Sequence, residues 1–186
     1  MYAFLKMSGR GLAAMMALAL LVSAVPAAAK YETPEAKAEA SEAAMIARMD
    51  MEQVFGGKEP KPGQYLWRKG NFPGEPRVVI GLSDQLAYLY RGDELVAVAA
   101  ISSGTDKHPT PKGIFEVRLK KPFHRSIKYD NAPMPFMQMF DQYGTALHAG
   151  HNPGYPASHG CVRLPAEFAR RLYAITDHGT TVMIGA

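Results

Sequence analysis

The feature that most constrains the fold is a run of short apolar segments with turn residues between them. Three strand-like segments follow one another at residues 77–82, 86–90 and 95–101. Their spacing and the turn residues between them, such as Ser83 and Gly92, are typical of an antiparallel β-meander. Further strands are expected at 114–119, 145–147 and 180–184, with a helix at 166–174. The pattern predicts a mainly β domain over residues 64–186.

Residues 1–29 have the layout of a secretory signal peptide. Lys6 and Arg10 precede an apolar run over residues 12–25, and small alanines follow it. The run is short for a membrane-spanning helix, which needs about 20 residues. We therefore expect cleavage after Ala29 and an exported protein without a stable transmembrane span. An uncleaved signal anchor is the alternative.

Residues 30–63 are expected to form a helical appendage and a linker. Thr33 can cap a helix with Pro34 in its first turn, and Gly56 can end it. Apolar residues recur at spacings of three or four, at Ala40, Ala44, Ala47, Met51 and Val54. This thin stripe favours a spacer or a helix docked on the domain over a helix that binds a partner.

Composition excludes several classes of protein. The single cysteine rules out an intramolecular disulfide framework and a zinc site built on several thiolates. The formal net charge of +4 is too small to predict nucleic-acid binding, and we expect no nucleic-acid partner. Basic residues gather around an expected surface loop at 120–143, namely Arg118, Lys120, Lys121, Arg125 and Lys128. They form either a solvated face or a surface for an anionic carbohydrate or peptide polymer.

Three histidines lie close in sequence to the only cysteine: His148, His151 and His159 precede Cys161. A free thiol with an ordinary pKa is only about 3% thiolate at pH 7, so a contacting histidine that takes its proton creates a usable nucleophile. Gly160 leaves room for a substrate beside the sulfur, and two adjacent main-chain N–H groups there can bind an oxyanion. Arg163, two positions on in an extended segment, would point to the same side as Cys161 and can hold a carboxylate.

A family resemblance rests on these residues. The stretch from Ser158 to Leu164, preceded by the segment from Leu147 to Gly150, resembles the signature of the YkuD-type L,D-transpeptidases. The likeness covers roughly residues 76–185 and includes the turn and strand at 110–115 and the segment 134–137. It implies a mainly β, sandwich-like catalytic domain with one or two packed helices, here preceded by the N-terminal helix.

The resemblance also implies a periplasmic, cell-wall-associated enzyme that needs no metal or cofactor. Cys161 matches the nucleophile that attacks a peptidoglycan stem peptide, releases terminal D-Ala and forms a thioester. The acceptor is a neighbouring stem, the amine of an outer-membrane protein, a D-amino acid or water, and the sequence does not choose among them.

The same resemblance implies roles for the surrounding residues. His148 matches the general acid/base, and the carbonyl of Ala149 or Gly150 would orient it. Substrate binding is expected of the motif residues Ser158, His159 and Arg163, and of Tyr129 or Phe136. Ala149 replaces a Gly or Ser of many members, and the segment between His148 and Cys161 is shorter than in many of them. The short segment leaves His151 as a rival base, and His159 as a further group that can move a proton.

Two other functions compete with this interpretation. His148, His151 and either His159 or Cys161 are residue types that zinc accepts, which would suit a zinc-dependent cell-wall hydrolase. Against it, Glu167 is the only acidic residue near the cluster, and no HExxH motif is present. The basic loop and the N-terminal helix would suit a non-catalytic peptidoglycan-binding or anchoring module, but the His and Cys pair argues against that module.

Overall fold

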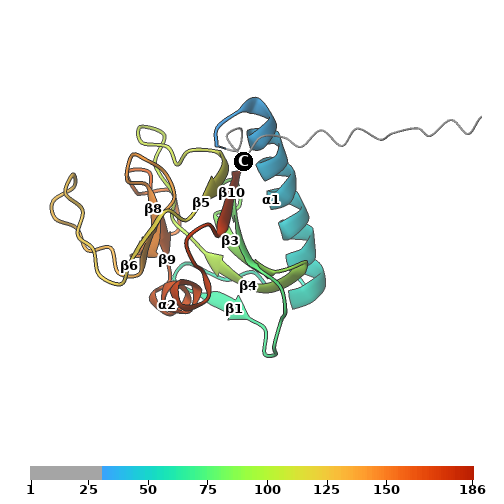
Figure 1. Ribbon diagram of the computed structural model, residues 1–186. Coiled ribbons are helices and arrows are strands. Elements are labelled where there is room, and N and C mark those ends of the chain that lie inside the picture. The colour runs from blue at the N-terminus through green and yellow to red at the C-terminus, as the bar shows by residue number, and fades with distance from the viewer. Residues whose placement is uncertain (1–30) are drawn as a thin grey trace, which may run out of the picture.

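The computed structural model describes residues 31–186, which form two β-sheets and two helices (Figure 1). The predicted signal peptide lies outside the described residues. Within residues 31–186, no helix has the length and apolar character to cross a membrane. The helices are α1 (Pro34–Phe55) and α2 (Ala166–Ile175).

The larger sheet contains the predicted meander, and the mainly β prediction is confirmed. Its strand order is β1-β4-β3-β2-β10-β5, and β10 is the parallel neighbour of β2. The strands are β1 (Tyr65–Trp67), β2 (Pro76–Gly81), β3 (Leu86–Arg91), β4 (Glu94–Ala100), β5 (Gly113–Glu116) and β10 (Thr181–Gly185). Side chains alternate along β2 between the two faces of this sheet. Val78 and Ile80 pack in the core shared with the smaller sheet, and Val79 packs in the core shared with α1.

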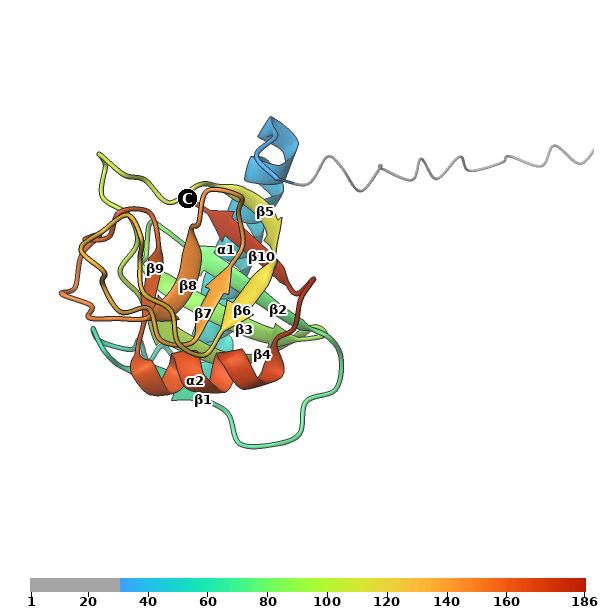
Figure 2. The same cartoon turned by 60° about the vertical axis from the view of Figure 1, so that its left-hand side comes forward.

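The smaller sheet has the order β6-β7-β8-β9 and carries the signature residues. Its strands are β6 (Leu119–Lys121), β7 (Met137–Met139), β8 (Ala146–Ala149) and β9 (Val162–Leu164). Leu147, Val162 and Leu164 pack toward the larger sheet, and Phe168 of α2 joins the same core. Figure 2 shows α2 lying along one end of both sheets.

The helix α1 packs against the outer face of the larger sheet, on the side away from the smaller one (Figure 1). Thr33 accepts the Ala36 N–H at 3.1 Å, and Gly56 ends the helix with a left-handed φ of 63°. The predicted stripe is buried except for Val54, and Ala36 completes it. Gly185 is required here, since a Cβ would lie 2.4 Å from the Ala40 carbonyl oxygen.

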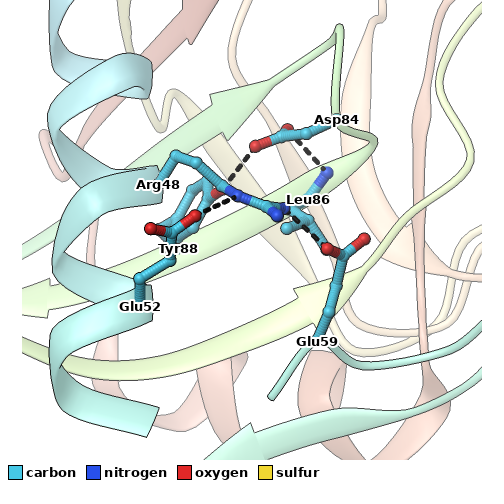
Figure 3. A network of polar contacts seen from close by, with 6 residues as sticks. All are labelled: Arg48, Glu52, Glu59, Asp84, Leu86 and Tyr88. Atoms are coloured by element: carbon cyan, nitrogen blue, oxygen red, sulfur yellow. Dashed lines mark hydrogen bonds and ion pairs between the residues drawn. The ribbon is translucent and has the colours of Figure 1, made fainter. Parts of the chain in front are cut away.

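Polar contacts lie on both sides of the interface between α1 and the sheet beneath it, and Figure 3 shows those of Arg48, Asp84 and Tyr88. Arg48 pairs with Glu59 at 2.7 Å and with Glu52 at 3.5 Å. The Tyr88 hydroxyl donates to Asp84, whose pKa is raised by burial although this hydrogen bond opposes the shift. Tyr90 similarly donates to Asp50 of α1 at 2.6 Å. These buried hydroxyls are therefore satisfied, as burial requires.

The expected loop at 120–143 is longer than the loop observed. Its ends form β6 and β7, which are too short for alternation to reveal in the sequence. Lys120 is no member of a solvated face: its Nζ donates to the carbonyls of Tyr173 and Thr176 at the end of α2. Burial lowers the pKa of Lys120, and its ammonium completes the helix terminus.

Candidate active site

The pairing of β8 with β9 places the cysteine and one histidine on a common face. The two strands run parallel, with Leu147 opposite Val162 and His148 opposite Arg163. Leu147 and Val162 point into the inter-sheet core. Alternation therefore turns His148, Arg163 and the preceding Cys161 to the opposite face. All three line a cavity of about 980 Å³ on that face.

The ring of His148 is buried and fixed. It is 7% exposed, and its Nδ1 lies 2.8 Å from the Ala149 carbonyl oxygen. A carbonyl only accepts, so Nδ1 carries the proton and Nε2 keeps a lone pair. Burial lowers the pKa of His148, the hydrogen bond to Ala149 opposes this, and Arg163 adds to the lowering. The imidazole is therefore neutral at pH 7 and able to accept a proton.

The Cys161 thiol is partly buried against a small cluster that includes Met134, Met137 and Ala146. Burial is the main cause that raises the pKa of this thiol, and Asp141 adds to it. The backbone of Ala146 and the charge of Arg163 lower it in turn. A raised thiol pKa together with a lowered imidazole pKa gives two neutral groups at pH 7, so a nucleophilic role for this sulfur would require the loss of its proton.

The loop before the cysteine is held by its own serine. Ser158 Oγ accepts the Gly160 N–H at 3.0 Å and donates to the Cys161 carbonyl. The Gly160 N–H is therefore not free, which corrects the expectation of two available oxyanion donors at this point. Within residues 31–186 the Cys161 N–H has no hydrogen-bond partner and is the donor left open.

Arg163 stands beside His148 with its side chain over Gly150. A Cβ at Gly150 would lie 3.0 Å from Arg163 Cγ, so glycine gives this side chain its place. Among the described residues the Arg163 guanidinium takes part in no ion pair. Arg163 lines the cavity, and its planar guanidinium has the geometry to bind a carboxylate.

The far wall of the cavity comes from the loop between β6 and β7. Tyr129 of this loop stacks on His159, with ring centroids 4.2 Å apart and planes 19° from parallel. The ring of His108 also contacts His159, with ring centroids 4.8 Å apart. Lys128 Nζ donates to the Tyr143 carbonyl at 3.1 Å and ties the loop to the opposite rim.

The expected substrate-binding residues do not all reach the cavity. Tyr129, Ser158 and His159 line it, as do His124 and His151, but Phe136 is not among its lining residues. The Phe136 ring lies 6.0 Å from Tyr173 of α2 and packs on the core. His151 and His159 are exposed, whereas His148 is buried and hydrogen-bonded, which favours His148 as the base.

A segment that the sequence did not single out holds the signature loop in place. The main chain of Ser102 pairs with Arg163 in both directions, at 3.1 and 2.9 Å, and the Ser103 carbonyl accepts the Ala157 and Ser158 N–H groups. Gln85, at a left-handed φ of 55°, accepts the Ser103 N–H at 3.0 Å. These contacts join the meander to the loop before Cys161 across long sequence distances, and no local sequence pattern predicts them.

Comparison with known families gives a clear match. The family model of the L,D-transpeptidase catalytic domain, YkuD, matches residues 75–184. The chain belongs to the YkuD family. Residues 31–186 thus contain an L,D-transpeptidase catalytic domain, with α1 preceding the matched region.

Solved L,D-transpeptidases share the fold of this YkuD chain. One from Mycobacterium smegmatis has 19% sequence identity and a TM-score of 0.55, covering 60% of this chain and 59% of that one. One from Stackebrandtia nassauensis has 23% identity and a TM-score of 0.56, covering 73% and 64%. L,D-transpeptidase 1 of Mycobacterium tuberculosis has 18% identity and a TM-score of 0.53, covering 60% and 62%.

These identities establish the fold alone. The chain spans about three fifths of the length of these solved structures. No curated protein matches the chain.

Proposed function

We propose that this chain is an L,D-transpeptidase that acts on peptidoglycan stem peptides through a thioester on Cys161. The observation that carries the proposal is that Cys161, directly before β9, and the buried His148 of the adjacent strand β8 line the same cavity, with Nε2 of His148 left without a hydrogen-bond partner among the described residues. Family membership supplies the reaction class, and the substrate and the thioester are proposed.

Acylation begins with the stem peptide in the cavity and a substrate carboxylate on Arg163. Nε2 of His148 takes the thiol proton as Cys161 Sγ attacks the carbonyl carbon that precedes terminal D-Ala. The carbonyl oxygen becomes an oxyanion, which the Cys161 N–H stabilises. The C–N bond then breaks, His148 returns the proton to the leaving amine, and D-Ala departs.

Transfer reverses these roles. An acceptor amine attacks the thioester carbon, His148 takes the amine proton, and the sulfur leaves and is protonated again. We propose a neighbouring stem as acceptor. The amine of an outer-membrane protein, a D-amino acid and water are outcomes that product mass spectrometry with each acceptor separates. Export to the periplasm is also proposed, and an N-terminal sequence that starts at Lys30 in the exported protein would support it.

The decisive experiment offers the purified protein a disaccharide tetrapeptide. Release of D-Ala by the wild type and not by Cys161→Ser supports the proposal. Binding of the muropeptide without D-Ala release would instead indicate an anchoring module. A release that chelators abolish and thiol alkylation leaves intact would indicate a zinc-dependent hydrolase.

A further inference from the structure

The peptide bond between Gly160 and Cys161 is held from one side by a buried threonine. Thr110 Oγ1 donates to the Gly160 carbonyl oxygen at 2.8 Å and accepts the Gly104 N–H at 2.9 Å. The residue is 4% exposed, so water hardly competes for either bond. Thr110 does not line the cavity and cannot contact a substrate there.

Gly160 depends on this support because its own geometry does not fix the peptide. Its φ of 111° is a conformation that side-chain-bearing residues rarely adopt. A Cβ there would have its nearest neighbours 3.7 to 4.0 Å away, at ordinary contact distance, so it is this φ and not a lack of space that favours glycine. Glycine allows a wide range of ψ angles, and the Thr110 hydroxyl is the group that donates a hydrogen bond to the carbonyl of this peptide.

The crossing of the two segments is built for this contact. A Cβ at Gly104 would lie 2.7 Å from the Thr110 nitrogen and 2.9 Å from the Gly160 Cα. No side chain fits at that position. The glycine at 104 therefore lets the Thr110 segment approach the nucleophile loop closely enough for the hydroxyl to reach Gly160.

The orientation of this peptide decides where the Cys161 N–H points. A trans peptide directs its C=O and its N–H to opposite sides. With the Gly160 carbonyl turned to Thr110, the Cys161 N–H points away from Thr110. The Gly160 N–H is already bound to Ser158, so a rotated peptide would leave the sulfur without a main-chain donor beside it.

We propose that Thr110 is a positioning residue that locks the Gly160–Cys161 peptide so that the Cys161 N–H is presented to the oxyanion. This inference rests on the proposed thioester function. It assigns Thr110 an effect on acylation through the peptide, with no contact to substrate and no effect on the reactivity of the sulfur itself.

The kinetic test compares two reactions of the same sulfur. Acylation by the tetrapeptide passes through an oxyanion, whereas alkylation by iodoacetamide does not. Thr110→Val should slow acylation about 10- to 100-fold, somewhat less than the loss of a whole oxyanion donor. Its alkylation rate should stay within about twofold of wild type, and Thr110→Ser should restore acylation. Unchanged acylation, an equal loss of alkylation, or failure of Thr110→Ser to restore the rate would each overturn the proposal.

A structural arm keeps this test separate from the proposed function. Failure of that function shows in the wild type, as an absence of both D-Ala release and thioester. A crystal structure of Thr110→Val, or of Thr110→Ala if the valine variant does not fold, shows the orientation of the Gly160–Cys161 peptide without any turnover. A Gly160 carbonyl rotated from its present direction supports the inference, and an unchanged peptide contradicts it.

Discussion

The polar groups in the interface beneath α1 and those on the cavity face of the smaller sheet differ in their hydrogen bonding. Under α1 an alanine stripe packs on the sheet, and the Tyr88 and Tyr90 hydroxyls each find a carboxylate. On the cavity face, Nε2 of His148 and the Cys161 N–H have no bonded partner within residues 31–186. The polar groups of the first region are hydrogen-bonded to each other, and those of the second are the groups that the proposed reaction would use. Substitutions should therefore separate the two.

The largest effect is expected at the nucleophile. Cys161→Ser should lower D-Ala release by about 10³-fold or more, because an unactivated hydroxyl is a far weaker nucleophile than a thiol. The thermal midpoint should change little, since the two side chains differ by one atom. A serine variant that keeps more than a tenth of the activity would contradict a covalent role for Cys161. Release kinetics and a thermal melt on the same samples measure both quantities.

Loss of the base is expected to be nearly as severe. His148→Ala should slow acylation about 10²- to 10⁴-fold, the usual contribution of general acid/base assistance. His151→Ala is the matched control, since it removes an exposed histidine of the same cavity, and it should stay within about threefold. The assignment of the base is reversed if the two variants exchange these results.

On the α1 side, two methionines of one helix give a matched pair. Met51 is 0% exposed and packs on the sheet, whereas Met49 is 48% exposed. Met51→Ala should lower the free energy of unfolding by about 2–4 kcal/mol, and Met49→Ala by less than about 0.5 kcal/mol. Denaturant unfolding measures both. At a temperature where both variants are folded, the rate of D-Ala release should match wild type. A lower rate in Met51→Ala alone would show that the α1 interface affects the cavity.

A smaller effect is expected from the cavity cation. Arg163→Lys keeps the charge but not the planar fork, so it should raise KM for the tetrapeptide about tenfold while kcat changes less. Steady-state kinetics over a range of tetrapeptide concentrations test this. An unchanged KM would remove Arg163 from carboxylate binding.

The pH dependence should differ between the two reactions of the sulfur. Alkylation needs the thiolate, and burial raises the pKa of Cys161, so its rate should rise with pH to a midpoint above that of an ordinary thiol. Acylation needs neutral His148, whose pKa burial lowers, so it should fall only at a pH below the ordinary histidine pKa of about 6.5. If acylation is already lost at a pH above 6.5 when the pH is lowered, His148 and Cys161 are not both neutral at pH 7.

The sequence predicted the parts of this molecule that rest on local patterns. The meander, the capped N-terminal helix and the adjacent cysteine and histidines all follow from spacing along the chain. The three-residue strands β1, β6, β7 and β9 are too short to show alternation. The pairing of these short strands with distant partners could therefore not be predicted from the sequence.

The site was predictable in its residues but not in its main-chain bonds. Phe136 was assigned to the substrate, yet a left-handed φ of 55° and its contact with Tyr173 take it to the core. The Gly160 N–H was expected to be open, and Ser158 occupies it. Thr110 reaches Gly160 across fifty positions, a contact that only the fold creates.

Intact-mass spectrometry with imipenem tests the central claim most directly. Imipenem is a β-lactam, whose strained amide acylates an activated nucleophile. We expect one covalent adduct on the wild-type protein, mapped by peptide digestion to Cys161 and missing from Cys161→Ser. An unmodified wild-type protein, or an adduct that persists in the serine variant, would contradict it.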